Sequence, residues 1–557
     1  MSTDQIAAPH PTAPHTTAPR LTPPRRQRSV QMLSRRPADI PRRPWESAAV
    51  FGFFAVVYAG FGEWLVAGKH VVGFVTLDHF NRALMVWHNS PPKLSAVGFD
   101  FPPLSTIFLT PFTIITPWAR TLVVVPVASA IFAAGVMVCL NTLMRRAAAP
   151  AAVRVLVLVA LAGNPLVVLY ASSGAGDFMP LFFALAGLGA LAAWYVTADI
   201  RLVLLAGLAF AVASLAGYGT LLLFLVATLG VAAVLARNRA HDDEIEGTTV
   251  GFTVPTVYAV ALWVAFGLII NHRPLGWIPR QYGTEHFTFA EIVRDTARLV
   301  LDGAPIAIVV LPALVIVGVA RRDGFTLWCA AFLAATILMP GLAAAFHLTT
   351  SPMAMRDALP ILLVATAGAI WLLRALPAQR GFVALALIAA LVGSVPWTFS
   401  QMRTFPHQNL EAVFVNALST GRSQDGARNQ SGQIVGIGTE EDMANWIRAH
   451  VTGRDAVLTD NAQTYGVMLL SGRPGIFFDR VDESDGPWMK VARDPAGTVQ
   501  FLLLTRGNQN DLLAQLYPGA AKGADRQLPV VHANARYTLV RVAPGYVRPN
   551  ITSGETS

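Results

Sequence analysis

Long apolar runs recur along most of this chain and determine its predicted architecture. Between residues 46 and 399, eleven segments are apolar over about 20 residues, the length that an α-helix needs to cross a bilayer. The predicted spans are 46–67, 119–143, 151–171, 177–198, 201–217, 218–236, 249–270, 301–320, 324–345, 357–376 and 381–399. The stretch 201–236 is too long for one span and short for two, and its central Gly217-Tyr218-Gly219 break favours two. The pattern predicts a polytopic α-helical membrane protein.

The composition agrees with this pattern. Hydrophobic residues make up 54% of the chain and charged residues 13%, whereas soluble domains carry about 25% charged residues. Both cysteines, Cys139 and Cys329, lie inside apolar runs, where a thiol behaves as a small hydrophobe. A disulfide framework and a Cys/His zinc site are therefore excluded, and the sequence predicts no metal site.

Basic residues orient the predicted spans. If the N-terminus is cytoplasmic, every loop on that side carries arginine, as expected of short cytoplasmic loops. These arginines are Arg145, Arg146, Arg154, Arg201, Arg237, Arg239, Arg321, Arg322, Arg374 and Arg380. An odd number of spans then places the C-terminal domain outside the cell. The many Ala, Arg, Gly and Val residues favour a GC-rich bacterial genome, such as that of an actinobacterium, so we predict a multi-pass protein of a bacterial plasma membrane.

Residues 1–45 form a Pro-rich tail that contributes most of the formal charge of +9. Eight arginines against two aspartates give the tail a charge of +6, and it has almost no large apolar side chains with which to form a core. We predict a disordered cytoplasmic tail that obeys the positive-inside rule. Nucleic-acid or anionic-lipid binding is the weaker alternative, and we expect no nucleic-acid partner.

Three loops on the predicted outer side are candidates for chemistry, at 68–118, 271–300 and 346–356. In the first, four apolar residues recur at helical spacing opposite a polar face, which predicts an amphipathic helix lying on the membrane. The apolar residues are Leu77, Phe80, Leu84 and Trp87, and the polar ones are Asp78, His79, Asn81 and Arg82. The proline-interrupted stretch 101–117 is predicted to be re-entrant or juxtamembrane. In the second loop, Thr288 and Glu291 predict a capping box that starts a helix.

From about residue 401 the composition becomes that of a soluble domain. Residues 401–557 hold fifteen Lys/Arg and fifteen Asp/Glu, so this segment is neutral. We predict a helix capped by Thr439 and ending near His450, strands at about 456–459, 499–504 and 536–542, and a helix at 508–516. The alternation predicts a small α/β domain. Residues 46–400 would form the transmembrane domain.

Carboxylates on the predicted outer side are the main candidates for chemistry. A charged group beside hydrocarbon is costly and is by default a functional hypothesis. Asp78 lies on the polar face of the amphipathic helix, Asp100 precedes Phe101-Pro102-Pro103-Leu104, and Asp177 opens a span. Structural roles are the alternatives, because Asp78 is four residues from Arg82 and Asp177 stands where a helix N-cap would.

The order of these motifs resembles that of the GT-C glycosyltransferases, in the branch of the protein mannosyltransferases and lipid A aminoarabinose transferases. The resemblance rests on Asp78 in the first outer loop, Pro102-Pro103-Leu104 before the next span, Asn164-Pro165 ending a span, Asp177 starting another, and Arg356 before a late span. It covers residues 46–400 in layout but only these short motifs in sequence. It implies a GT-C-like membrane domain with an extracytoplasmic α/β domain.

The resemblance also implies a reaction and its residues. A polyprenyl-phosphate sugar, with mannose or arabinose as the favoured sugar, would donate with inversion to a glycan, glycolipid or protein of the envelope. Asp78 would act as the base, with Asp177 orienting the acceptor or the catalytic loop and Asp100 as a further catalytic candidate. Candidates to bind the departing phosphate are Arg356, His347 and Arg280. Candidates to contact acceptor or sugar are His79, Arg82, Trp87, Tyr282 and His286.

Structural roles remain open for several of these residues. Arg356 could be an interfacial arginine, Tyr282, His286 and His347 could shape loops, and Trp87 could be a membrane anchor. The family usually has an acidic residue where this chain has His79. This departure leaves metal dependence open: no cofactor is required, and a divalent cation is not ruled out.

Two other functions compete with the glycosyltransferase hypothesis. A transporter or flippase of lipid-linked intermediates would show internal repeats and charges near the bilayer midplane, whereas here the acidic residues collect near one surface. A non-catalytic envelope scaffold is the second alternative.

Overall fold

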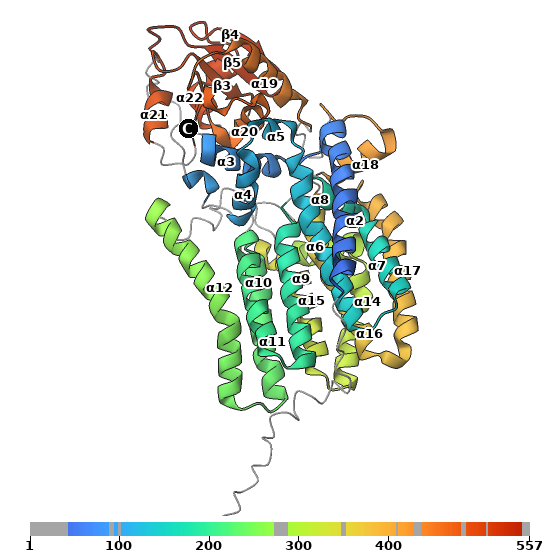
Figure 1. The fold of residues 1–557 in the computed structure, drawn as a ribbon. Coiled ribbons are helices and arrows are strands. Elements are labelled where there is room, and N and C mark those ends of the chain that lie inside the picture. The colour runs from blue at the N-terminus through green and yellow to red at the C-terminus, as the bar shows by residue number, and fades with distance from the viewer. Residues whose placement is uncertain are drawn as a thin grey trace, which may run out of the picture.

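The computed structural model describes residues 43–88, 94–98, 102–174, 176–271, 288–346, 353–407, 410–426, 436–480, 486–507 and 511–547. A bundle of long helices carries a small α/β domain at one end (Figure 1). Most of the N-terminal tail and the candidate residues Asp100, Arg280, Tyr282, His286 and His347 lie outside the described residues.

Helices make up most of the described part of the predicted membrane domain. Eight of them are long and apolar enough to cross a membrane, and ten if each of two bent pairs counts as one span. The eight are α2 with its terminal π turn (Pro44–Gly68), α6 (Val124–Arg146), α9 (Phe178–Thr197), α11 (Thr220–Arg237), α12 (Asp242–Asn271), α15 (Gly324–Ala345), α16 (Ala358–Ala375) with the 3₁₀ turn before it, and α17 (Arg380–Gln401) with the turn before it. The eleventh predicted segment is α10 (Ile200–Ala216), a shorter apolar helix.

The two bent pairs break where the sequence supplies caps. Helices α7 (Ala151–Ala162) and α8 (Pro165–Ser172) meet at 73°. Asn164 accepts a hydrogen bond from the Leu166 amide at 3.0 Å, and Pro165 occupies the first helical position, where no amide hydrogen is needed. Helices α13 (Phe289–Gly303) and α14 (Ile306–Ala320) meet at 101°. The predicted capping box of Thr288 and Glu291 is confirmed at the start of α13.

The predicted amphipathic helix is α3 (Phe74–His88), and it is enclosed rather than lying open on a membrane surface. Its apolar residues Leu77, Phe80 and Leu84 are fully buried, but so is Asn81 on the predicted polar face. Asn81 donates to Asn461 at 2.6 Å in α20 (Asn461–Ser471) of the C-terminal domain. The C-terminal domain therefore covers the side that the sequence pattern assigned to water.

Residues 102–121, which follow α3, contain only short helices. These are α4 (Leu104–Leu109), a 3₁₀ turn (Thr110–Thr113) and α5 (Thr116–Thr121). Trp87 of α3 donates its indole hydrogen to the Thr110 carbonyl at 2.9 Å, which ties α3 to this segment. None of the three is long enough to cross a bilayer.

The C-terminal domain is built on a five-stranded sheet in the order β2-β1-β3-β5-β4. Strands β1 (Val457–Thr459), β2 (Phe477–Asp479) and β3 (Phe501–Thr505) are parallel, and β5 (Tyr537–Arg541) and β4 (Val530–Ala533) complete the sheet antiparallel. Alternate strand residues face two separate cores. One core includes α19 (Gly438–His450) and α20, and the other includes α21 (Gly486–Arg493), α22 (Leu512–Leu516) and α23 (Pro518–Ala521).

The structure corrects one local prediction in this domain and adds elements that the sequence did not reveal. Thr439 lies inside the first turn of α19, and its N-cap position is Ile437, which provides no side-chain cap. The sequence analysis missed strands β2 and β4, which are three and four residues long.

A pair of side chains connects the membrane domain to the segment before the α/β domain. His70, just after the π turn of α2, bonds through Nδ1 to Asp425 Oδ2 at 2.5 Å, and Asp425 follows α18 (Glu411–Thr420). The hydrogen bond that His70 donates to Asp425 raises the pKa of His70. Burial alone would raise the pKa of Asp425, but hydrogen bonds from His70 and Ser423 hold it below its usual value.

The contribution of this pair to stability should depend on pH. The raised pKa of His70 gives a contribution that is complete below pH 6.5, the ordinary histidine value, and is lost as the pH rises through the raised pKa. The Asp425 contribution is lost as the pH falls below 3.8. We expect His70→Gln to lower the free energy of unfolding by at most about 1 kcal/mol at pH 6, with the difference vanishing by pH 9.

Thermal unfolding of the detergent-solubilised protein at both pH values measures this effect. His241→Gln, in the exposed turn before α12, is the matched control and should show no such pH dependence. A stability difference for His70→Gln that stays constant from pH 6 to pH 9 would show that the His70 charge does not contribute.

Candidate active site

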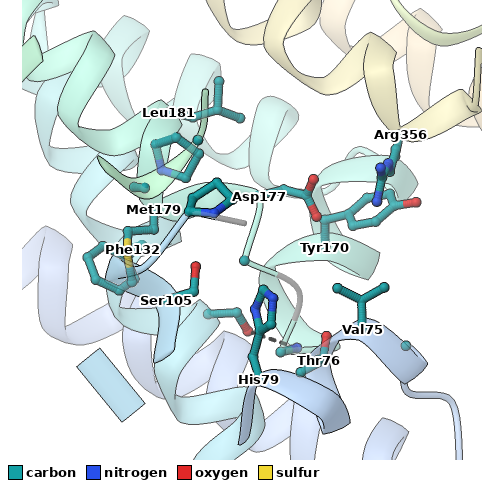
Figure 2. A pocket seen from close by; sticks show the side chains of 18 of the residues that line it. Val75, Thr76, His79, Ser105, Phe132, Tyr170, Asp177, Met179, Leu181 and Arg356 are labelled. Atoms are coloured by element: carbon teal, nitrogen blue, oxygen red, sulfur yellow. Dashed lines mark hydrogen bonds between the residues drawn. The ribbon is translucent and has the colours of Figure 1, made fainter. Parts of the chain in front are cut away.

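A cavity of about 370 Å³ opens at the end of the helix bundle nearest the C-terminal domain. Its volume is within the range of small-molecule sites. Phe132, Met179 and Leu181 gather on one side of the view in Figure 2, Tyr170 and Arg356 lie on the other, and Asp177 lies between them. The cavity therefore joins an apolar wall to a polar, charged one.

The Asp177 carboxylate is presented by a tight connection between α8 and α9. The Ser129 hydroxyl of α6 donates to the Ala171 carbonyl at 2.8 Å and accepts from the Gly174 amide at 3.1 Å. Gly174 has a φ of +78°, and a Cβ there would lie 2.0 Å from Val125, so only glycine allows this approach. Asp177 occupies the N-cap position of α9, but its side chain makes no capping hydrogen bond. The carboxylate thus faces the cavity instead of capping the helix.

Arg356 reaches the cavity from the 3₁₀ turn Met355–Asp357 that precedes α16. The turn is held by the Ala354 amide, which donates to Asp357 Oδ2 at 3.0 Å. Arg356 Nε lies 3.9 Å from Asp357 Oδ1, a loose contact that leaves most of the guanidinium donors to face the cavity. The basic residue predicted before this span is therefore on the cavity wall.

Asp177 and Arg356 are charged partners across a gap. Asp177 is the largest electrostatic influence on the Arg356 guanidinium. Among the described residues, the ion pair of Arg356 is with Asp357, and Asp177 and Arg356 do not come within the 4.0 Å of an ion pair. A carboxylate and a guanidinium that face one cavity without touching leave room for a polar substrate between them.

The neighbouring residues Asp78 and His79 have different surroundings. Asp78 accepts from Arg82 Nε at 3.0 Å, the pairing that the sequence offered as the structural alternative, and it is not among the residues that line the cavity. His79 does line the cavity. Burial lowers the pKa of His79, because an imidazolium loses its hydration there. We therefore expect a neutral imidazole on the cavity wall at neutral pH.

The structure thus brings together three of the predicted site residues, Asp177, Arg356 and His79. Arg82 is directed to Asp78, and Trp87 is half exposed and bonded to the segment after α3.

Two polar residues beside the cavity escaped the sequence analysis. Tyr170 lines the cavity and donates to Glu411 Oε1 at 2.7 Å, and Glu411 is fully buried. Glu411 belongs to α18, about 240 residues away in sequence. The available signal was a lone carboxylate at the start of the apolar run Glu411–Ala417, a costly placement that indicates a role. The pair links the cavity wall to the segment that leads to the C-terminal domain.

Metal ligands do not gather in the part of the chain that the structure describes, since no group of three His, Cys, Asp or Glu side chains there could hold an ion. Among the described residues that line the cavity, His79, Asp177 and Asp357 have donor atoms suited to a divalent cation. Whether a cation takes part stays a prediction of the sequence resemblance.

Comparison with known proteins identifies the fold. The chain is similar to ArnT from Cupriavidus metallidurans bound to undecaprenyl phosphate, with 14% identity over 91% of this chain and 99% of that one and a TM-score of 0.56. The apo state of the same ArnT matches with 13% identity over 90% and 99% of the two chains, also at 0.56. Archaeoglobus fulgidus AglB, in complex with an inhibitory peptide and a dolichol-phosphate, has a lower TM-score of 0.45, with 10% identity over 83% of this chain and 69% of that one.

No protein-family model matches the chain, and no curated protein matches it. At the identities above, the likeness to ArnT establishes the fold alone. The predicted fold class is confirmed: the chain is a polytopic helical membrane protein of the GT-C fold with a small C-terminal α/β domain.

Proposed function

We propose that this protein is an inverting glycosyltransferase that moves a sugar from a polyprenyl-phosphate carrier to a hydroxyl of a cell-envelope acceptor. The observation that carries the proposal is the cavity in which Asp177 and Arg356 face each other without ion-pair contact beside an apolar wall. An amphiphilic donor needs this combination, because its phosphate requires a cation and its prenyl chain requires apolar side chains. Undecaprenyl phosphate, to which the similar ArnT structure is bound, is of this chemical class.

In the proposed reaction, the acceptor oxygen attacks the anomeric carbon from the face opposite the phosphate. The Asp177 carboxylate takes the hydroxyl proton as the new carbon–oxygen bond forms. The bond from the anomeric carbon to the phosphate oxygen breaks, and the polyprenyl phosphate leaves with that electron pair. Arg356 stabilises the negative charge that develops on the phosphate. Asp177 thus acts on the attacking hydroxyl, and Arg356 acts on the departing phosphate.

The base differs from the one that the sequence resemblance favours. The resemblance implies Asp78, but in the structure the Asp78 carboxylate accepts two bonds from Arg82 and lies off the cavity wall. Asp177 lies on that wall and makes no capping bond. A base must reach the proton that it removes, so we assign this role to Asp177. Asp78 would then stabilise α3, which carries His79.

The proposed location rests on the charge distribution of the sequence, and the proposed sugar rests on the family resemblance. We propose that the cavity faces the outside of a bacterial plasma membrane, because the arginine-rich loops would then lie in the cytoplasm. Mannose or arabinose are the proposed sugars, and a glycan, glycolipid or protein the proposed acceptor.

The direct test is a transfer assay. Purified protein in nanodiscs would be given radiolabelled polyprenyl-phosphate mannose or arabinose and a crude envelope fraction as acceptor. We expect label to move into the acceptor fraction, and protein-free nanodiscs provide the control. Failure of transfer with every donor, by protein that is folded, would contradict the proposal and favour the transporter or scaffold hypothesis.

A further inference from the structure

A second cavity, of about 430 Å³, lies at the opposite end of the helix bundle. Helices α6, α9 and α16 each run from the first cavity to the second: their early residues Phe132, Met179 and Pro360 line one, and their late residues Arg146, Thr197 and Arg374 line the other. On α16 the two lining positions are 14 residues apart, or about 21 Å at 1.5 Å per residue. This basic pocket is therefore separate from the proposed active site.

The charges of the basic pocket do not balance. Arg145, Arg146 and Arg374 line it together with one carboxylate, Asp199, so three positive charges and one negative charge leave a net charge of +2. Arg145 lies 4.0 Å from Glu46, outside the pocket lining. Asp199 accepts from the Arg201 amide at 3.0 Å and caps α10. Arg374 acts electrostatically on Arg146, and the two like charges repel.

Helix capping explains only part of this arrangement. Arg374 donates to the Arg146 carbonyl at 2.7 Å and so satisfies a carbonyl at the C-terminal end of α6. That bond uses one of the five hydrogens of the guanidinium. Within the described ranges, neither Arg146 nor Arg374 is ion-paired with a carboxylate. Two half-buried guanidinium groups that repel each other are costly unless an anion joins them.

We propose that this basic pocket binds a phosphate-bearing anion between Arg146 and Arg374. The planar guanidinium is suited to phosphate because its paired hydrogens match two phosphate oxygens. The other pocket residues include apolar side chains such as Leu143, Ile370 and Trp371. Basic pockets between membrane helices are a recurrent form of binding site for anionic lipid headgroups. The shared chemistry is a phosphate mono- or diester, carried by a phospholipid or free in solution.

Native mass spectrometry of the detergent-purified full chain tests the lipid source. The protein would be titrated with phosphatidylglycerol and, separately, with phosphatidylcholine, which carries no net charge. Arg146→Gln removes one guanidinium but keeps the carbonyl that Arg374 binds. We expect wild type to retain phosphatidylglycerol in preference to phosphatidylcholine, and Arg146→Gln to bind it about fivefold to tenfold more weakly.

Two further variants make the test independent of folding defects. Arg321→Gln, at an exposed position after α14, is the matched control and should leave retention unchanged. Asp199→Asn removes the negative charge of the pocket while asparagine can still cap α10, so it should tighten binding. Equal retention in wild type, Arg146→Gln and Asp199→Asn would overturn the proposal.

Inorganic phosphate tests the second source of the anion, a phosphate that is free in solution and not part of a phospholipid. Thermal unfolding would be compared in phosphate and in chloride at matched ionic strength. Protection by phosphate that Arg146→Gln abolishes, without preference for phosphatidylglycerol, would assign the pocket to a free phosphate. The proposal would be overturned if phosphate does not raise the unfolding temperature and phosphatidylglycerol is not retained in preference to phosphatidylcholine. None of these measurements involves sugar transfer, so their outcome is independent of the proposed enzymatic function.

Discussion

Asp177→Asn should lower kcat for sugar transfer by a factor of about 10² to 10⁴, the usual range for removal of a general base. The amide keeps the size of the side chain but cannot take the acceptor proton. Because the Asp177 side chain makes no capping bond in the structure, the substitution should leave thermal stability nearly unchanged. Single-turnover transfer in nanodiscs, with enzyme in excess over the labelled donor, measures the chemical step directly.

Asp78→Asn is the matched comparison for this prediction. It also converts an aspartate to its amide on the same side of the bundle, but Asp78 is bonded to Arg82 and does not line the cavity. We expect a loss of less than about tenfold, because only the position of α3 would change. If Asp78→Asn abolishes transfer and Asp177→Asn does not, the base is Asp78, as the sequence resemblance implies, and our assignment from geometry is wrong.

Arg356→Gln should lower kcat by a factor of about 10² to 10³, the range observed when a donor to a developing negative charge is removed. The effect should fall on kcat more than on KM, because the charge on the phosphate grows in the transition state. Arg356→Lys should recover only part of the rate, since an ammonium keeps the charge but lacks the bidentate geometry.

Donor binding and transfer must be measured separately to interpret this second prediction. Binding of the labelled donor to nanodiscs reports the ground state, and the single-turnover rate reports the chemical step. Arg321→Gln, remote from the cavity, controls for a general effect of lost charge. A variant whose KM rises while kcat is unchanged would show that Arg356 binds donor and departing phosphate equally, and the proposed role would fail.

The two predictions depend on one structural relationship, the gap between Asp177 and Arg356. Asp177 is held by the glycine turn after α8, and Arg356 by the turn before α16. The two elements are about 180 residues apart in sequence. They meet because α6 contacts both α8 and α9, while α16 packs against α6. The proposed catalytic pair is therefore positioned by helix packing.

Much of the architecture followed from the sequence itself. Apolar runs of span length identify membrane helices because unpaired backbone groups in hydrocarbon must be satisfied within a helix. Local chemistry was also readable: Thr288 with Glu291 starts a helix. The break that Asn164-Pro165 makes inside the predicted span 151–171 was found only in the structure. The order of short motifs was enough to predict the GT-C fold that the likeness to ArnT confirms.

Only the tertiary structure decided which of the predicted residues share a cavity. Helical periodicity places Asp78 and His79 together on a polar face, but adjacent residues point about 100° apart around a helix, and His79 alone of the two lines the cavity. The polar face of α3 looked solvated because the sequence could not show that α20 covers Asn81. Likewise, the arginines at 146 and 374 followed a topology rule in the sequence, and only the packing of α6 against α16 made them one pocket. The sequence determined the elements because their signals are local, and long-range packing determined the sites.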